Sequence, residues 1–246
     1  MKNESFIYGI RAVIEAISAG ESVNKVFIQK GLRGDLFKEL EATLKKNGIG
    51  YSFVPVEKLN RLSHKNHQGV IAVISPVSFH NFETLVDEVT SAKEDPLFLL
   101  LDRVSDVRNF GAIIRTAVCT GVDGIVILSS GSAPVSADTV KTSAGAVFNI
   151  PIAKVSHMKD AVYYLQASGV EVVAATEKTS NTLYDLDLKK PLAIVMGSED
   201  KGISPALLKI TDHLAKIPMV GDIASLNVSV ACGVFLYEAV RQRMSS

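Results

Sequence analysis

The stretch LFLLLDRVSDVRNFGAIIRTA, residues 97–117, decides the fold prediction for the longer part of the chain. It begins with an apolar run of strand length, as expected for a strand that is buried on both faces. A polar turn follows, and then apolar residues recur at helical spacing from Phe110 to Val118. Arg115 lies off this apolar stripe. The stretch therefore predicts a buried strand that leads into a helix opening near Asn109.

The same alternation continues to the end of the chain. Strand-like runs lie at residues 97–104, 124–129, 170–176, 192–199 and 213–219. Helical segments follow them at about 109–121, 137–146, 157–168, 204–212 and 225–243. Strands that alternate with helices indicate an α/β fold, in which a mostly parallel sheet is covered on both faces.

The front of the chain predicts a smaller α/β unit. Strands are expected at 23–29, 51–56 and 68–75, with helices near 10–17, 35–48 and 57–63. From Pro76 the pattern breaks, and residues 76–95 are interpreted as a linker with one short helix. We therefore predict a domain at 1–75, a linker at 76–95 and a second domain at 96–246.

Composition and charge narrow the class of protein. Hydrophobic residues make up 47% of the chain and charged residues 21%, as in a globular protein. No apolar run reaches the roughly 18 residues of a membrane span, and MKNESFIYGI lacks the apolar core of a signal peptide. Cys119 and Cys232 are interpreted as small core residues of a reduced, cytoplasmic protein, and no zinc cluster is expected.

The charges are distributed unevenly along the chain. Residues 1–75 carry 11 Lys and Arg against 7 Asp and Glu, a net charge of +4, whereas residues 76–246 carry 15 against 19, a net charge of −4. A basic front is expected where a protein contacts phosphates. Chance scatter in a small domain is the alternative.

Three predicted strand ends are polar and rich in glycine, although GxGxxG, GxxxxGK[ST] and GxSxG are missing. The first end carries Asn109 and Arg115, which could also be an ordinary helix cap and a solvated side chain. The second, LAIVMGSEDKGIS (192–204), has a glycine at 197 and could be a plain turn. The third places Ser225, Asn227 and a further serine at one helix N-terminus, more polar groups than capping requires.

Together these segments resemble the SpoU (TrmH) family of SPOUT RNA 2′-O-ribose methyltransferases. The resemblance rests on NxGAIxRTA (109–117), MGSExxGIS (196–204) and IPMxGxxxSLNVSVA (217–231), in this order. IYGIRAVIEAI and HQGVIA at the front are similar to the substrate-binding domain of the bacterial 23S rRNA guanosine 2′-O-methyltransferases within that family. The resemblance covers nearly the whole chain.

The resemblance implies a catalytic domain with a deep C-terminal trefoil knot and an S-adenosylmethionine site made largely of backbone around Gly197, Ile217 and Leu226. It implies a homodimer that acts on RNA, with a guanosine of 23S ribosomal RNA as the expected target and no metal. Transfer RNA and a non-catalytic RNA-binding role are the alternatives. The family's polar functional positions fall on Asn109, Arg115, Glu199, Ser225 and Asn227.

The sequence departs from the family's pattern at two positions. Val107 stands where the family often has proline, and Phe148 where it often has glutamate. Both leave the reaction class unchanged, but Phe148 puts the substrate detail in question.

The final predicted helix is apolar on two faces, and such a helix is expected to be buried on both. If one domain covers only one face, a second copy of the chain covers the other, which favours a dimer. One face consists of Leu226, Val230, Val234 and Tyr237, and the other of Val228, Ala231, Phe235 and Ala239. A central core helix in a monomer is the alternative.

Overall fold

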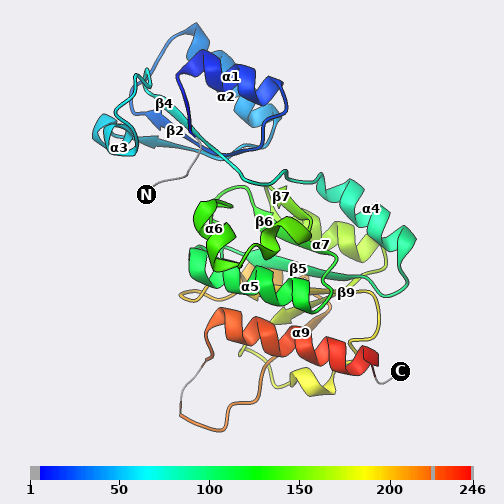
Figure 1. Ribbon diagram of the computed structural model, residues 1–246. Helices are drawn as coiled ribbons and strands as arrows, with labels where there is room; N and C mark the ends of the chain where they lie inside the picture. Colours follow the sequence, from blue (N-terminus) through cyan, green and yellow to red (C-terminus); the bar gives the residue numbers. More distant parts are fainter. Residues whose placement is uncertain (1–5, 223–224, 245–246) are drawn as a thin grey trace. The chain divides into compact units, whose positions relative to one another are not determined.

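The computed structural model describes residues 6–222 and 225–244, and it contains two compact units (Figure 1). The first comprises residues 6–78 together with 134–138, and the second comprises 79–133 together with 139–244. None of the described helices is long and apolar enough to cross a membrane.

The first unit is built on a four-stranded sheet with the order β1-β4-β2-β3, in which only β2 and β3 are parallel. Its strands are β1 (Phe6–Tyr8), β2 (Val23–Gln29), β3 (Tyr51–Val54) and β4 (Val70–Ile74). Its helices are α1 (Ile10–Ser18), α2 (Asp35–Lys46) and α3 (Val56–Leu62). Helices α1 and α2 cover one face of the sheet and enclose a core that includes Val13, Leu40 and Ala72. On the other face, Leu59 of α3 packs with Ile71 in a smaller cluster.

The second unit is built on a six-stranded sheet with the order β10-β8-β9-β5-β6-β7, and every neighbouring pair is parallel. Its strands are β5 (Leu97–Asp102), β6 (Gly124–Leu128), β7 (Ile152–Val155), β8 (Glu171–Ala175), β9 (Leu192–Gly197) and β10 (His213–Ala215). This confirms the predicted α/β class and the parallel sheet.

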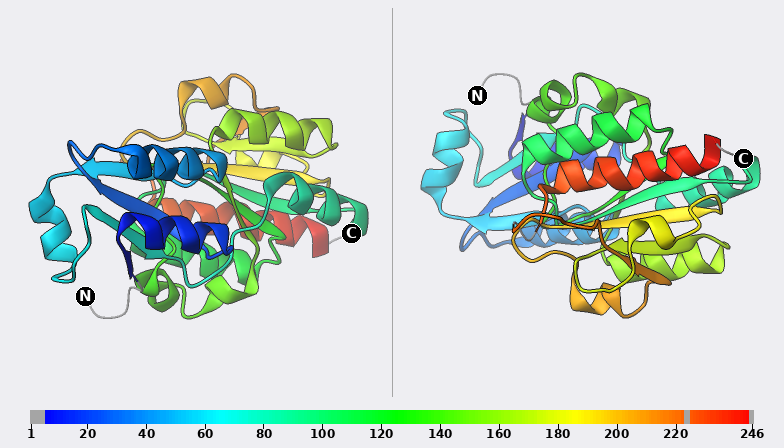
Figure 2. Two further views of the ribbon diagram at one scale, coloured as in Figure 1. Left: turned by 90° about the horizontal axis from the view of Figure 1, so that it is seen from above. Right: turned by 90° about the horizontal axis from the view of Figure 1, so that it is seen from below.

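Helices cover both faces of this sheet (Figure 2). On one face, α4 (Phe82–Ala92), α7 (Met158–Ala167) and α8 (Pro205–Leu208) pack on Phe98 and Val195. On the other face, α9 (Val228–Met244) contacts β9 and lies beside α5 (Val107–Cys119). The short α6 (Ala137–Thr142) and the 3₁₀ turns η1 (Ala146–Asn149) and η2 (Leu183–Asp185) complete the fold.

The structure corrects several predicted boundaries. Strands β1 and β7, of three and four residues, were not predicted. Helix α5 begins at Val107 rather than near Asn109, and α9 begins at Val228 rather than at residue 225. Both differences come from side chains that cap the helices, which are described with the site.

Two further expectations have different outcomes. Cys232 is buried in α9, and burial raises the pKa of its thiol to about 12, whereas Cys119 is exposed, so its assignment to the core is wrong. The last buried apolar residue of α5 is Ala117, and Cys119, the final residue of the helix, faces solvent. Helix α4 packs its apolar residues into the core of the second unit. The domain limits and the trefoil knot stay predictions.

Helix α5 lies so close to α6 that one of its residues has no space for a side chain. A Cβ atom at Gly111 would overlap the Thr142 side chain and lie 2.7 Å from the Thr142 carbonyl carbon. Thr142 is held there by its hydroxyl, which donates to the Val107 carbonyl oxygen at 3.1 Å.

We therefore expect Gly111→Ala to lower the free energy of unfolding by about 1–3 kcal/mol, because overpacking outweighs the gain in helix propensity. Gly233→Ala in α9 is the matched control, since its Cβ would meet nothing nearer than 3.9 Å. It should be neutral or stabilise by up to about 1 kcal/mol. Urea unfolding measures both, and equal effects would contradict the steric argument.

Candidate active site

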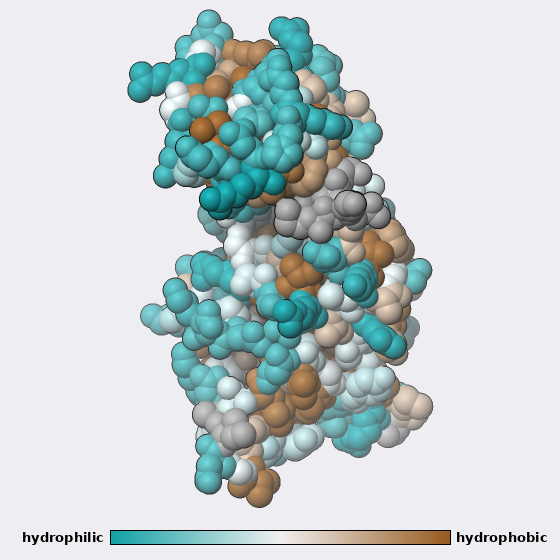
Figure 3. Space-filling view, turned by 60° about the vertical axis from the view of Figure 1, so that its left-hand side comes forward, coloured by the Kyte–Doolittle hydropathy of each residue, from teal (hydrophilic) through white to brown (hydrophobic). Residues whose placement is uncertain are grey.

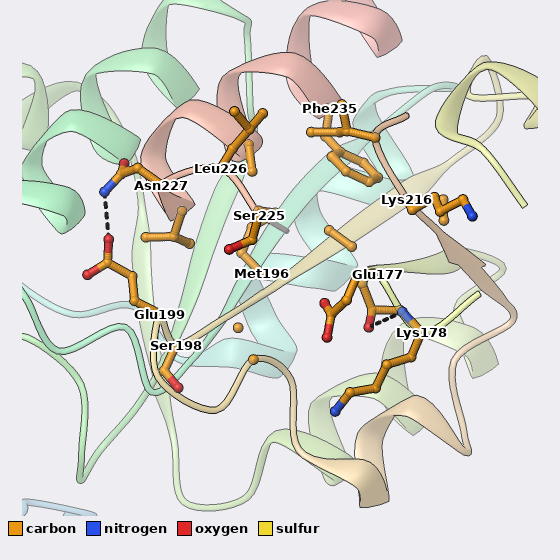
Figure 4. Close-up of a pocket in the computed structure, with 18 of the residues that line it drawn as sticks. Glu177, Lys178, Met196, Ser198, Glu199, Lys216, Ser225, Leu226, Asn227 and Phe235 are labelled. Atoms are coloured by element: carbon orange, nitrogen blue, oxygen red, sulfur yellow. Dashed lines mark hydrogen bonds between the residues drawn. The ribbon is translucent and has the colours of Figure 1, made fainter. Parts of the chain in front are cut away.

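A cavity of about 920 Å³ lies at the carboxyl ends of the strands in the second unit (Figure 4). The order β10-β8-β9 places the ends of these three strands side by side, and the loops after them form the walls. Such an edge is where open α/β sheets bind ligands. The lining consists of residues 175–178, 196–202, 215–219 and 225–228, with Ala231 and Phe235 of α9.

The backbone at the end of β9 is packed without space for a side chain. A Cβ atom at Gly197 would overlap the backbone of Gly202 and Ile203. The intervening loop folds back on itself, with Ser198 N donating to Gly202 O at 3.2 Å and Gly202 N donating to Ser198 O at 2.8 Å. Gly202 has φ of +64°, a conformation that glycine adopts readily. This part of the wall is therefore backbone.

Apolar side chains form another part of the wall. Phe235 and Met196 are almost completely buried, Ile217 is half-buried, and Leu226 keeps 37% of its surface exposed. Gly197, Ile217 and Leu226, the three predicted cofactor residues, all line the cavity.

Three of the predicted polar residues meet at the rim of the cavity. The Asn227 side-chain amide donates to Asn109 Oδ1 at 3.0 Å. It also donates to Glu199 Oε1 at 2.6 Å (Figure 4). These residues are separated by up to 118 positions in the chain. The fold therefore joins the three motif segments through one amide group.

Capping explains how these side chains are held. Asp106 Oδ1 accepts from Arg108 N and Asn109 N, both at 2.9 Å, so Asp106 is the cap of α5. Asn109 is therefore not the cap of this helix, as the alternative interpretation had it, and its side chain is available to Asn227. Asn227 Oδ1 accepts from Ser229 N at 2.9 Å, and the Asn227 carbonyl accepts from Ala231 N at 2.9 Å, so α9 starts only after this residue.

The other two predicted residues lie differently. Ser225 lines the cavity beside Leu226. Arg115 is exposed on α5 and does not line the cavity. Among the described residues it forms no hydrogen bond or ion pair with Asn109, Glu199 or Asn227. Residues 223 and 224, in the predicted third motif, lie outside the described residues.

Sequence reasoning missed the contribution of β8. Thr176, Glu177 and Lys178 follow this strand and line the cavity. The segment VEVVAAT was predicted as a strand, but its end has no glycine or cluster of amides to mark it. Only the pairing of β8 with β9 brings it to the site.

Charged groups of both signs surround the cavity. The acidic residues are Glu177, Glu199 and Asp200, and the basic residues are Lys178, Lys201 and Lys216. This balance suits a ligand that carries both charges. Over the described part of the chain, no group of three or more His, Cys, Asp or Glu side chains is placed to hold a metal ion.

We call the two hydrogen bonds from the Asn227 amide to Asn109 and Glu199 the Asn227 link. The variant Asn227→Asp tests it, because aspartate keeps an oxygen to cap α9 but replaces the amide donor with a carboxylate facing Glu199. We expect the free energy of unfolding at neutral pH to fall by up to about 1 kcal/mol, because the two carboxylates are exposed enough for water to weaken their repulsion. Adding Glu199→Gln should restore the loss. Urea unfolding of the three proteins gives the comparison.

Asn81→Asp is the matched control. Asn81 caps α4 by accepting from Thr84 N at 2.9 Å, and a carboxylate is favourable at a helix N-terminus. This variant should be unchanged or slightly more stable. An equal loss at both positions would assign the effect to capping and not to the Asn227 link.

Comparison with known proteins gives the family. The model of the SpoU rRNA methylase family matches residues 96–237, and that of the RNA 2′-O ribose methyltransferase substrate-binding domain matches residues 6–80. The chain is 36% identical over 248 residues to the 23S rRNA (guanosine-2′-O-)-methyltransferase RlmB of Vibrio vulnificus, covering 100% of both proteins.

Two more relatives agree with this match. A Synechocystis protein named an uncharacterized tRNA/rRNA methyltransferase is 34% identical, and the chain spans 62% of its length. The crystal structure of the SpoU methyltransferase AviRb from Streptomyces viridochromogenes, in complex with the cofactor AdoMet, superposes with a TM-score of 0.62 at 27% identity, covering 99% of this chain and 92% of that one. The cavity, the joined motif segments and these matches lead to one conclusion: the chain belongs to the SpoU family of RNA methyltransferases.

Proposed function

We propose that the protein transfers a methyl group from S-adenosylmethionine to the 2′-hydroxyl of a ribose in RNA, with a guanosine of 23S ribosomal RNA as the target. The observation that carries the proposal is the Asn227 link, which joins Asn109 and Glu199 at the rim of a cofactor-sized cavity. The full-length similarity to the Vibrio vulnificus enzyme supports the choice of target.

S-adenosylmethionine is the cofactor of this family, and the residues present fit it. The cavity volume lies within the range of small-molecule sites. Apolar side chains around Leu226 and Phe235 suit the adenine ring, while backbone polar groups near Gly197 suit its hydrogen-bonding edge. Charged side chains of both signs suit the amino-acid part. When bound, the cofactor supplies a methyl group on a positively charged sulfur.

The polar rim would position the ribose. Methyl transfer to an oxygen requires the attacking oxygen, the methyl carbon and the sulfur to lie in line, and positioning of this kind lowers a barrier by roughly 7–11 kcal/mol in the best cases. Glu199 and Asn109 both accept a hydrogen bond from the Asn227 amide, and Glu199 lines the cavity. We assign them to orienting the hydroxyl, with Ser225 beside them.

Arg115 is assigned to the RNA phosphate. A guanidinium stays protonated at neutral pH and is a poor base, but it binds phosphate oxygens through two parallel hydrogen bonds. Arg115 is exposed on α5 and does not line the cofactor cavity, so its side chain is accessible to an RNA phosphate. Its charge would also stabilise the oxygen as the hydroxyl loses its proton.

The first domain is proposed to bind the RNA. It carries the excess of positive charge, and its sequence matches the substrate-binding model over residues 6–80. We propose the limits 1–75, 76–95 and 96–246 for this domain, the linker and the catalytic domain, with α4 of the linker packed on the core of the catalytic domain. A reduced cytoplasmic setting suits both an RNA substrate and the free Cys119 thiol.

Transfer RNA is the second candidate substrate, because the Synechocystis relative is named for both tRNA and rRNA. A non-catalytic RNA-binding role is disfavoured, since Asn109, Arg115 and Asn227 are all retained.

We also propose a homodimer formed through α9. The helix is apolar on two faces, as predicted, and only one is covered within the chain: Val228, Phe235 and Ala239 are buried. On the other face, Val230 is 52% exposed and Tyr237 is 56% exposed. Apolar patches are visible on the surface of this unit in the space-filling view (Figure 3). An isologous contact through this face would cover it.

The reaction can be tested with the purified chain, S-adenosylmethionine and unmodified transcripts of 23S rRNA and tRNA. A 2′-O-methyl group blocks alkaline cleavage of the adjacent phosphodiester, so a gap in the hydrolysis ladder locates the target. We expect one gap at a guanosine of 23S rRNA. A gap only in tRNA would reassign the substrate, and a methylated base without a gap would contradict the proposal.

Arg115→Lys provides the mechanistic arm of this experiment, because lysine keeps the charge and loses the two-pronged contact. The single-turnover rate should fall roughly 10²–10³-fold, with nearly unchanged cofactor affinity. Arg115→Ala should be slower still. Arg241→Lys, at an exposed helical arginine paired with Glu238, is the control and should react normally. Normal rates in both Arg115 variants would remove this residue from the mechanism.

The dimer predicts a mass by light scattering of about twice 26.4 kDa at micromolar concentration. Val230→Asp combined with Tyr237→Asp should give a monomer, because the charges would be buried in the contact. Tyr184→Asp is the control, since Tyr184 is equally exposed at 57% but lies in η2. A monomeric wild type would refute the dimer.

A further inference from the structure

The first unit has an unusual surface on the side of its sheet opposite α1 and α2. The strand register aligns Tyr8, Ile71 and Phe27 in one row across β1, β4 and β2, and Phe6, Val73 and Lys25 in the next. Residues in such rows point to the same face. Rings on β1 and β2 are therefore about 10 Å apart, twice the strand spacing of ~4.8 Å.

Lysine ammonium groups lie over these half-buried rings. Lys25 Nζ is 5.4 Å and Lys58 Nζ 5.2 Å from the centre of the Phe27 ring, and Lys65 Nζ is 5.3 Å from that of Tyr8. Phe6 adjoins Tyr8, with ring centres 6.1 Å apart. We call the surface formed by Phe6, Tyr8, Phe27, Lys25, Lys58 and Lys65 the aromatic face.

The lysines of this face differ from those of α2 in their ion pairs. Among the described residues, no Asp or Glu forms an ion pair with Lys25, Lys58 or Lys65. On α2, across the sheet, Lys38 pairs with Asp35 at 3.0 Å and Lys45 with Glu41 at 3.3 Å. Within the described part of the unit, two lysines of α2 are therefore paired with carboxylates, whereas the three lysines of the aromatic face form no ion pair.

This combination of groups has a specific chemical complement. A flat base can stack on an aromatic ring whatever its identity, and a phosphate can take the ammonium that covers the ring in the free protein. Exposed cation–π contacts are weak, so the lysines can leave the rings for a phosphate. Bases in an RNA duplex are already stacked on each other and cannot reach such a surface, whereas unpaired bases can.

We propose that the aromatic face binds unpaired nucleotides of the RNA substrate, with bases stacked on Phe27 and Tyr8 and phosphates on Lys25, Lys58 and Lys65. This inference rests on the proposed function for its RNA substrate. It adds which surface of the protein binds the RNA, and that the bound nucleotides are unpaired. It places recognition of single-stranded RNA in a unit separate from the cofactor cavity.

The test is binding of the full-length chain to a short fluorescent oligouridine, measured by anisotropy. The oligouridine should bind more tightly than a blunt RNA duplex of equal length. Phe27→Leu combined with Tyr8→Leu should weaken oligouridine binding by roughly 30-fold or more, because each of the two lost base stacks removes about fivefold to 150-fold in affinity. Tyr8→Phe alone keeps the ring and should bind as the wild type does.

A lysine pair supplies a second test that does not touch the core. Lys58→Gln with Lys65→Gln should reduce the slope of log affinity against log salt by about 1.4, since each phosphate contact to a single strand contributes ~0.7. Lys38→Gln with Lys45→Gln removes the same charge from the α2 side and should leave the slope near that of the wild type. If the leucine variant does not unfold cooperatively, the comparison of the two lysine pairs tests the aromatic face instead.

The outcomes separate this inference from the proposed function, because ribose methylation is measured in parallel. Unchanged oligouridine affinity in a folded leucine variant, or equal slopes in the two lysine pairs, would overturn the aromatic face while methylation by the wild type still supports the enzyme. The opposite outcome is also distinguishable. If the wild type methylates no RNA but binds oligouridine, and the variants lose this binding, the aromatic face is supported and the proposed reaction is refuted.

Discussion

Close contact between two backbone segments is the constraint on which the site depends. Gly197 ends β9 directly against Gly202 and Ile203, with no side chain between them. This contact folds the intervening loop back over the strand end, and it holds Glu199 where Asn227 can reach it. A second contact ties the far end of this loop to the neighbouring strand β5, where Asp102 accepts a hydrogen bond from Ser204 N at 2.8 Å. The loop is thus fixed at both ends, and the cavity lies beside a rigid wall.

Much of the fold follows from periodicity in the sequence. The continuous apolar runs at 97–101 and 192–196 can only be buried on both faces, so a parallel sheet covered by helices was predictable. The edge strand β7 was not predictable in the same way, because its four residues include Lys154, which interrupts the apolar signal. Helix starts were misplaced for a different reason. Asp106 caps α5 and Asn227 caps α9, and sequence alone does not say which of several polar residues near a helix start accepts from the backbone N–H groups.

The candidate site was predictable in part. The motif segments marked Asn109, Glu199 and Asn227 as a group, and the structure brings these three together. The contribution of β8 was not predictable, since Glu177 and Lys178 reach the cavity only through strand order, which depends on long-range packing. The position of Arg115 outside the cavity could not be read from its spacing either, because a helix of thirteen residues presents side chains in every direction.

The double task of Asn227 affects what comparison of sequences can reveal about activity. This side chain begins α9 and also joins the polar rim, so a relative that had lost its reaction would still need the residue to keep its longest helix intact. Selection for folding alone would preserve it. Asn109 and Glu199 have no such structural duty, since Asp106 caps α5 and Glu199 lies on an exposed loop. In a survey of relatives, these two positions would therefore separate working enzymes from inactive descendants more sharply than Asn227, which also reports an intact fold.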